Sequence, residues 1–198
     1  MKLKSILSVL FIILNYGFAN HLTVPDHLHD WNVLQDSDVW VGWTMKDDIQ
    51  WCRSEKTLPF EMKHISHIIE DKENYPNVFK RIEDTTILAP DVVHISLDMP
   101  FPFAGRDYIV KYVSNKTDTE NTYTFTAYDE IKVPERKNYV RLINAGGRWT
   151  VIPHGNGKTK VTYTWNGELR GDFPDWALNR AWVEQGNEVI TWIENALE

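Results

Sequence analysis

Two groups of residues rich in histidine are the first candidates for metal binding in this sequence. Glu61, His64 and His67 recur at three-residue steps, so a helix would place them on one face. A second group lies near the N-terminus: His21, His27 and His29. Zinc takes imidazole and carboxylate ligands, but neither group completes a ligand set of known geometry. We therefore expect no metal site and no cofactor.

Catalytic motifs are not apparent elsewhere in the chain. Neighbouring residues on a strand point to opposite faces, so the carboxylate pairs at 47–48 and 129–130 are better read as solvated turns than as acid/base pairs. No Gly-x-Ser-x-Gly motif is present, and Cys52 has no histidine beside it, which favours a packed thiol. The glycines at 155–157 lack the spacing of a phosphate-binding loop and are typical of a hairpin turn. The sequence predicts no catalytic residue and no enzyme.

One proline-rich corner precedes a charge pair, in the stretch DMPFPFAGRDYIV at 98–110. Pro100 and Pro102 cannot donate hydrogen bonds to a neighbouring strand, so pairing stops there, and Gly105 permits a turn. The corner is predicted to end one strand and begin its neighbour. Arg106 and Asp107 are interpreted as structural, because an arginine at a strand start can cap carbonyl or carboxylate groups with two hydrogen bonds.

Composition narrows the classes of function. The 198 residues carry a formal net charge of −7, and this acidity argues against a nucleic-acid partner, which needs a basic surface. Cys52 is the only cysteine, so no internal disulfide is possible and the core must hold the fold. Nine tryptophans, eight tyrosines and eight phenylalanines can fill a core or line a cavity.

The first nineteen residues have the pattern of a signal peptide. Lysines at positions 2 and 4 precede an apolar run at 5–14, and small residues at 17 and 19 suit a signal peptidase. The apolar run is short for a membrane-spanning helix. We expect cleavage after Ala19, a single domain at 20–198, and export to the periplasm or the medium. A retained N-terminal anchor is the alternative.

Periodicity predicts an α+β domain. Two strands come first, then two short helices, then a run of antiparallel strands separated by turn residues. The strands are expected at 39–44, 48–56, 85–88, 92–99, 108–114, 122–130, 139–145, 148–153 and 158–169, and the short helices at 59–70 and 76–79. Alternation at 160–166 indicates a sheet with one covered face.

A long C-terminal helix is predicted to cover that face. Asp172 can cap it and Pro174 suits its first turn, and the helix is expected at 175–197. Residues at steps of three and four form one apolar stripe: Leu178, Trp182, Gln185, Val189, Ile193 and Ala196.

This order of elements resembles the helix-grip fold, a curved antiparallel sheet wrapped around a long C-terminal helix. The sequence is similar to the START domain, the lipid-transfer family of the wider Bet v 1-like superfamily. The stretches that carry the resemblance are residues 51–56, PFPFAGRDYIVKY, GGRWTVIPHGNGKTKVTYTWNGEL and FPDWALNRAWVEQGNEVITWIENAL. The likeness covers about residues 31–197.

The resemblance implies a hollow protein that encloses one lipid between sheet and helix. The residues expected at the cavity wall are Tyr112, Phe125, Tyr163, Trp165, Trp182 and Val189. The alternative is that these six side chains fill a solid core. Phe101 and Phe103 would form a loop tip near the cavity mouth, where they would either dip into a membrane or fold back on the helix.

One departure from the family pattern concerns sterols. Cholesterol-binding members carry a buried arginine–acid pair, with the arginine six residues after that of the Arg-Asp-aromatic corner. Tyr112 occupies this position here, so the resemblance does not extend to that pair. The Tyr112 hydroxyl suits a neutral polar group of a ligand.

We therefore expect a monomeric, exported lipid-binding protein with a hydrophobic small molecule as its partner and transient membrane contact. A cavity enzyme of the cyclase/aromatase type and a solid-core interaction domain of the cell envelope are the alternatives.

Overall fold

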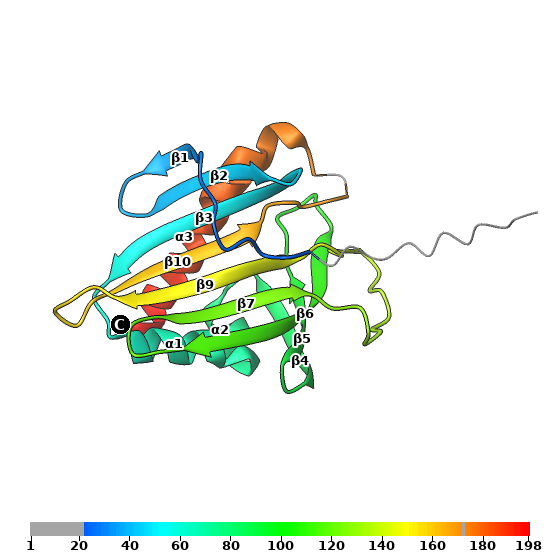
Figure 1. The fold of residues 1–198 in the computed structure, drawn as a ribbon. Helices are drawn as coiled ribbons and strands as arrows, with labels where there is room; N and C mark the ends of the chain where they lie inside the picture. The colour runs from blue at the N-terminus through cyan, green and yellow to red at the C-terminus, as the bar shows by residue number, and fades with distance from the viewer. Residues whose placement is uncertain (1–21, 172) are drawn as a thin grey trace, which may run out of the picture.

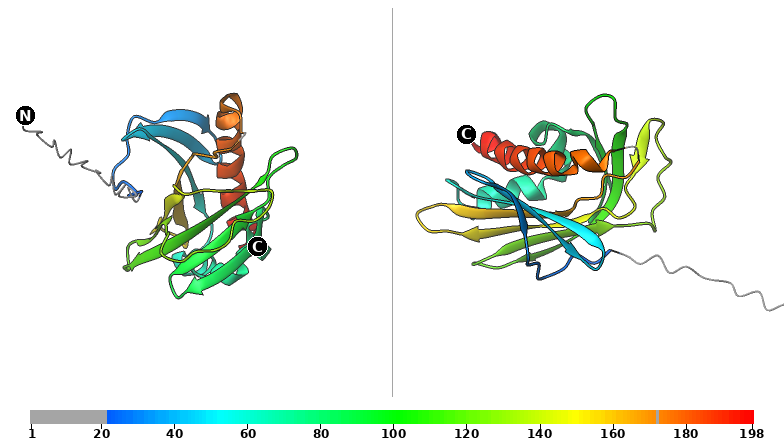
Figure 2. Two further views of the ribbon diagram at one scale, coloured as in Figure 1. Left: turned by 90° about the vertical axis from the view of Figure 1, so that its right-hand side faces the viewer. Right: turned by 90° about the horizontal axis from the view of Figure 1, so that it is seen from above.

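The computed structural model describes residues 22–171 and 173–198. The predicted signal peptide and the capping role of Asp172 lie outside these residues. Within them, the chain forms one strongly curved antiparallel sheet with three α-helices on its concave side (Figures 1 and 2). The α+β helix-grip architecture expected from the sequence is confirmed.

The sheet has nine strands in the order β1-β2-β3-β10-β9-β7-β6-β5-β4, and a tenth, β8, pairs with β6 alone. The strand bounds are β1 Asn32–Asp36, β2 Trp40–Lys46, β3 Ile49–Leu58, β4 Ile82–Ala89, β5 Val92–Leu97, β6 Gly105–Lys116, β7 Asn121–Ala127, β8 Tyr139–Arg141, β9 Gly146–Pro153 and β10 Thr159–Asn166. The helices α1 Met62–Glu70 and α2 Tyr75–Val78 form the insert, with a 3₁₀ turn at Lys72–Asn74 between them.

Several strand predictions need correction, and the strand expected at 122–130 is β7, which ends at Ala127. β1 was not expected, because its five residues alternate too little to mark a strand; it forms by pairing with β2. The strand expected at 139–145 is only β8, which pairs in parallel with Gly105–Asp107 of β6. β10 ends at Asn166 rather than at 169, since the chain leaves the sheet there toward the C-terminal helix.

The corner at 98–104 connects two neighbouring antiparallel strands, as predicted. β5 ends at Leu97, whose partner on β6 is Arg106. The residues between them cap the end of the sheet next to the start of the long helix. This arrangement places Phe103 of the corner against Phe173, just before α3.

The long helix α3 (Leu178–Leu197) follows a 3₁₀ turn at Asp175–Ala177 and crosses the concave face of the sheet (Figures 1 and 2). Its buried positions are Trp182, Gly186, Ile190 and Ile193. Gly186 permits close approach, because a Cβ there would lie 3.0 Å from Val41 and 3.1 Å from Ser54. The helix is therefore pressed onto β2 and β3 along its middle.

A small second core lies on the other face of the sheet. Leu22, Val24 and Leu28 of the N-terminal segment pack on Trp51 and Ile49 of β3. No helix among the described residues is long and apolar enough to cross a membrane.

Candidate ligand cavity

A cavity of about 540 Å³ lies between the concave face of the sheet, α2 and α3. This volume falls within the range of about 300–1,000 Å³ that is usual for small-molecule pockets. Its wall is mostly apolar and aromatic and comes from α2, β5, β6, β7, β9, β10 and α3. The concave side of the sheet is therefore not a solid core throughout.

Because side chains alternate between the two faces of a strand, several aromatic residues point from the concave face into this cavity. Tyr108 and Tyr112 are four residues apart on β6 and share a face, and Phe125, Trp149 and Tyr163 stand on the next strands of the same concave surface. Trp149 stacks on Tyr163 with ring centres 4.2 Å apart.

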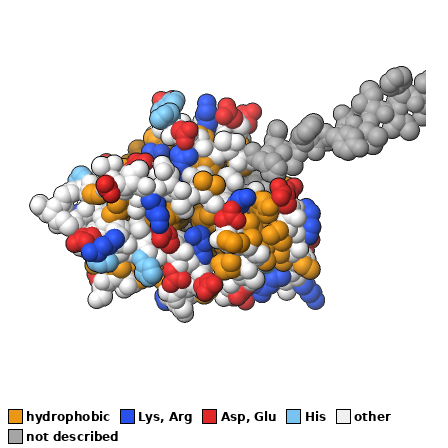
Figure 3. Space-filling model, turned by 60° about the horizontal axis from the view of Figure 1, so that its bottom comes forward, with side chains coloured by type: hydrophobic (Ala, Val, Ile, Leu, Met, Phe, Trp, Pro, Cys, Tyr) orange, Lys and Arg blue, Asp and Glu red, His pale blue; other side chains and the backbone are white. Residues whose placement is uncertain are grey.

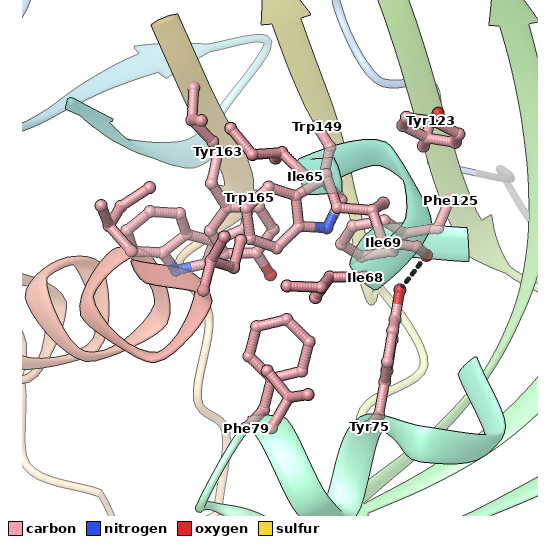
Figure 4. Packing of buried hydrophobic residues seen from close by; sticks show 14 of the residues in the cluster. Ile65, Ile68, Ile69, Tyr75, Phe79, Tyr123, Phe125, Trp149, Tyr163 and Trp165 are labelled. Carbon is pink, nitrogen blue, oxygen red and sulfur yellow. Dashed lines mark hydrogen bonds between the residues drawn. The ribbon is translucent and has the colours of Figure 1, made fainter. Parts of the chain in front are cut away.

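The helical insert closes the cavity from the opposite side. Tyr75 and Phe79, at the start and just after the end of α2, face the aromatic residues of the sheet (Figure 4). Their rings contact edge to face at 5.0 Å, and Phe79 lies 6.2 Å from Trp149. The hydroxyl of Tyr75 donates a hydrogen bond to the Ile69 carbonyl at 2.6 Å, which ties α2 to the end of α1.

Four tyrosine hydroxyls make the deep part of the wall partly polar. Burial raises the pKa of Tyr75, Tyr108, Tyr112 and Tyr163 well above the usual value for a phenol. The four side chains are therefore neutral at physiological pH. They can donate and accept hydrogen bonds but cannot hold a charged group by ion pairing.

The charged residues of the wall lie at its open rim. Arg81, beside β4, pairs with Glu188 and Glu184 of α3 at 2.7 and 2.8 Å. The side chains of these three residues are 25–49% exposed. Three further charged side chains at the rim are exposed to solvent: Asp98, Glu168 and Arg180. Ionic groups thus surround the mouth and leave the deep part uncharged.

Two large aromatic side chains project from the rim into solvent. Phe101, in the β5–β6 corner, is 97% exposed, and Trp176, just before α3, is 87% exposed. Both line the opening. In the space-filling view, apolar side chains gather in one region of the displayed face with charged residues around it (Figure 3). Exposed aromatic residues at a cavity mouth favour contact with an apolar surface.

The structural role predicted for Arg106 and Asp107 is visible in their contacts. Arg106 is fully buried and donates hydrogen bonds to the carbonyls of Leu169 and Arg170 at 2.7 and 3.0 Å, and also to that of Ala104. It thereby joins the start of β6 to the chain that leads into α3.

Asp107 is the centre of a second buried polar contact. It accepts two hydrogen bonds from Arg141 of β8 at 2.9 and 2.7 Å, and His94 Nε2 lies 2.9 Å from its Oδ2. Burial opposes ionisation, but the bonds from Arg141 and His94 outweigh it and hold the pKa of Asp107 below its usual value. Asp107 thus stays ionised and fastens β8 to the sheet.

Six of the eight residues expected at the cavity line it in the structure: Phe101, Phe103, Tyr112, Phe125, Tyr163 and Val189. The two phenylalanines of the corner behave differently from each other. Phe101 points into solvent, whereas Phe103 packs on Phe173, just before α3, with ring centres 4.8 Å apart. Membrane contact by the tip of this loop stays a prediction. Ligand contact by all six residues stays a prediction.

Trp165 and Trp182 were expected at the cavity wall but lie elsewhere. Neither belongs to the cavity wall. Trp182 packs on Trp43 at 5.6 Å and donates its Nε1 hydrogen to the Gly167 carbonyl at 2.9 Å. Trp165 is buried behind Tyr163, with ring centres 5.0 Å apart. The rings of Trp165 and Trp182 are packed within the core rather than in the cavity wall.

The wall residues that the sequence analysis missed include Tyr75, Phe79, Tyr108, Trp149 and Trp192. A signal for Tyr108 was present, since it shares a strand face with Tyr112. Tyr75 and Phe79 are four residues apart, the spacing of residues on one helical face.

Cys52 is fully buried, and burial strongly raises the pKa of its thiol, in keeping with a packed side chain. The described residues contain no group of three His, Cys, Asp or Glu side chains that could hold a metal ion.

Comparison with known proteins identifies the family. The START domain family matches residues 29–186, more than half of the chain. This protein belongs to the START domain family. The resemblance inferred from the corner, the last hairpin and the closing helix is thereby confirmed.

Solved structures share the fold. A STAR-related lipid transfer protein from Xanthomonas axonopodis has a TM-score of 0.72 and 19% identity, over 84% of this chain and 98% of that one. Human STARD10 has a TM-score of 0.76 and 16% identity, over 90% and 82% of the two chains. An aromatase/cyclase from Streptomyces sp. R1128 has a TM-score of 0.52 and 16% identity, over 75% and 95%. At these identities the likeness is one of fold.

A curated relative is an uncharacterized protein from Pseudomonas aeruginosa, which is 30% identical over 102 residues. The match covers 52% of this chain and 50% of that protein. The chain thus spans about half the length of this curated relative.

Proposed function

We propose that this START-domain protein binds one hydrophobic ligand, a lipid or a similar apolar molecule, inside the cavity and carries it between membranes. The observation that carries the proposal is the aromatic cavity itself, enclosed between the sheet, α2 and α3. Family membership and fold likeness to a lipid transfer protein support it. Binding would be noncovalent, driven by about 25 cal/mol per Å² of apolar surface removed from water.

The ligand would enter between the β5–β6 corner and the start of α3. Phe101 and Trp176 stand on these two segments and are exposed. Insertion of the two rings into a bilayer surface would bring the mouth to the lipid phase without passage through water. α3 is held by Lys56, which bonds Glu194 at 2.6 Å, and by the pairing of Gln35 with Asn187. Trp182 anchors the first turns of the helix through its bond to the Gly167 carbonyl, so the residues before it, around Trp176, are the part expected to move.

A carrier fits the wall better than an enzyme does. The described wall contains no histidine, cysteine, serine or lysine, and its carboxylates are on the exposed rim. General acid–base catalysis needs a titratable group within hydrogen-bond reach of the buried substrate. The cyclase/aromatase alternative would therefore have to rely on neutral tyrosines. We further propose that the protein works outside the cytoplasm, as the N-terminal pattern indicates.

Native mass spectrometry of the full chain, expressed with its export signal, tests the proposal. We expect a single added mass of lipid size on the monomer, and extraction would identify the ligand class. A protein that stays ligand-free and also fails to take up any lipid from a total membrane extract would contradict the carrier function. The N-terminal residue of the purified protein, read in the same spectra, tests cleavage after Ala19.

A further inference from the structure

The four cavity tyrosines come from distant parts of the chain and line the same cavity. Tyr108 and Tyr112 stand on β6, Tyr163 on β10 and Tyr75 on α2. Their hydroxyls are close enough for each to influence the ionisation of others: Tyr108 affects Tyr75, Tyr112 and Tyr163. A group of phenols in an otherwise apolar wall needs hydrogen-bond partners, because a buried polar group without one is costly.

Two of the four hydroxyls are satisfied by the protein. Tyr75 donates to the Ile69 carbonyl, which can only accept. The hydroxyls of Tyr112 and Tyr75 interact, and since the Tyr75 proton is already committed, Tyr112 is the donor in that pair. The Tyr112 hydroxyl therefore has a polar neighbour in Tyr75, whose own proton goes to the backbone of α1.

The other two hydroxyls remain open. Among the described residues, neither Tyr108 nor Tyr163 makes a hydrogen bond with the protein, and burial is the first cause of the raised pKa of both. Both residues line the cavity. Each hydroxyl therefore presents one donor and free lone pairs to whatever occupies the cavity.

Charge complementarity limits the occupant. Every charged side chain of the described wall is at the solvent-exposed rim, including Arg81, which is already paired with Glu184 and Glu188. An ionised carboxylate or phosphate next to the tyrosines would lack a cation and lose its hydration. A neutral polar group would find hydroxyl donors and acceptors there.

We infer that the buried end of the ligand carries a neutral hydrogen-bonding group, such as a hydroxyl, ester, ketone or amide, and that Tyr108 and Tyr163 recognise it. The inference rests on the proposed carrier function and adds a ligand class to it. Hydrocarbons without a polar group bind more weakly, and lipids whose only polar group is ionised place that group at the rim.

Three fluorescent probes of one ring system test the inference: pyrene, 1-pyrenemethanol and 1-pyrenecarboxylate. Binding to the full-length protein is followed by energy transfer from tryptophan to pyrene, since Trp149 and Trp192 are in the wall. We expect 1-pyrenemethanol to bind about threefold to tenfold more tightly than pyrene, the range of one net hydrogen bond. 1-Pyrenecarboxylate at pH 8 should bind more weakly than 1-pyrenemethanol.

The variants Tyr108→Phe, Tyr163→Phe and the double variant should remove this preference in steps while pyrene binding stays within about twofold. Phenylalanine keeps the ring and removes only the hydroxyl. Tyr128→Phe is the matched control, because Tyr128 lies outside the cavity wall and bonds Glu130 at 2.7 Å. This variant should keep the preference of the unmodified protein. Circular dichroism verifies the fold of each variant.

The two proposals fail in different ways. If the unmodified protein binds pyrene but does not prefer 1-pyrenemethanol, or keeps its preference in the double variant, the role of Tyr108 and Tyr163 is wrong and the carrier function stands. If 1-pyrenecarboxylate binds as tightly as 1-pyrenemethanol and loses affinity in the double variant, the neutral ligand class is wrong. If no probe binds, both the cavity as a binding site and the tyrosine inference are overturned.

Discussion

Two buried polar regions follow each other directly along β6 and differ in how their hydrogen bonds are satisfied. At the start of the strand, Arg106 and Asp107 bond to backbone carbonyls, Arg141 and His94. The next residue, Tyr108, presents its hydroxyl to the cavity. The first region completes its bonds within the protein and stabilises the fold. The second leaves them to a ligand, which is how a structural site and a binding site can be told apart.

Removal of the Asp107 carboxylate should have the largest effect on stability. Asp107→Ala leaves the guanidinium of Arg141 and the ring of His94 without their buried partner, and we expect a loss of about 3–5 kcal/mol in the free energy of unfolding. Urea denaturation at pH 7 measures it. Asp91→Ala is the control, because the Asp91–Lys111 pair is exposed and spans 3.5 Å, so its loss should cost less than about 1 kcal/mol. Equal losses in both variants would contradict the structural role.

A charge placed inside the cavity should abolish ligand retention with little change in stability. Val189 of α3 lines the cavity, so Val189→Arg brings a guanidinium into the space that an apolar ligand needs. We expect at least about a tenfold loss of affinity for pyrene or bound lipid. Thr191→Arg puts the same side chain on the exposed face of α3 and should retain the ligand. Similar affinity in the two variants would place the ligand elsewhere.

The pH dependence of stability should report the ionised state of Asp107. Its pKa is lowered in the folded protein by Arg141 and His94, against the opposing effect of burial. Its stabilising contribution is therefore complete above the usual aspartate pKa of about 3.9 and is lost as the pH falls through the lower pKa of the folded state. The difference in unfolding free energy between the unmodified protein and Asp107→Ala should shrink below about pH 4. A difference that stays constant from pH 7 to pH 3 would exclude this effect.

Loss of the exposed ring at the mouth should have the smallest effect on stability and a selective effect on transfer. Phe101→Ser removes a side chain that is 97% exposed, so the free energy of unfolding should change by no more than about 0.5 kcal/mol. Transfer of a fluorescent lipid between vesicles should slow several-fold while equilibrium binding stays unchanged. Val113→Ser, also at an exposed apolar residue but away from the cavity wall, should leave transfer unaffected. Equal transfer rates in the two variants would remove Phe101 from the membrane contact.

Local patterns in the sequence were enough to predict most elements. The proline corner, the hairpin at 155–157 and the stripe of α3 depend on residues close together in the chain, where backbone geometry and periodicity act directly. β1 and β8 were missed or misplaced because pairing with a distant strand, rather than local alternation, decides them. Trp165 and Tyr163 share a strand face, yet only Tyr163 lines the cavity, and periodicity carries no information on this difference.

By itself, the sequence determined the class of the fold, the family likeness, the closing helix and the structural character of Arg106 and Asp107. Only the tertiary structure decided which aromatic residues surround a cavity and which are packed solid, because this depends on where α3 contacts the curved sheet. It also placed Tyr163 of β10 and Tyr108 of β6 in the wall of one cavity, and Arg141 onto Asp107. Such placements of residues 34 to 55 positions apart follow from strand order and curvature, which no local pattern contains.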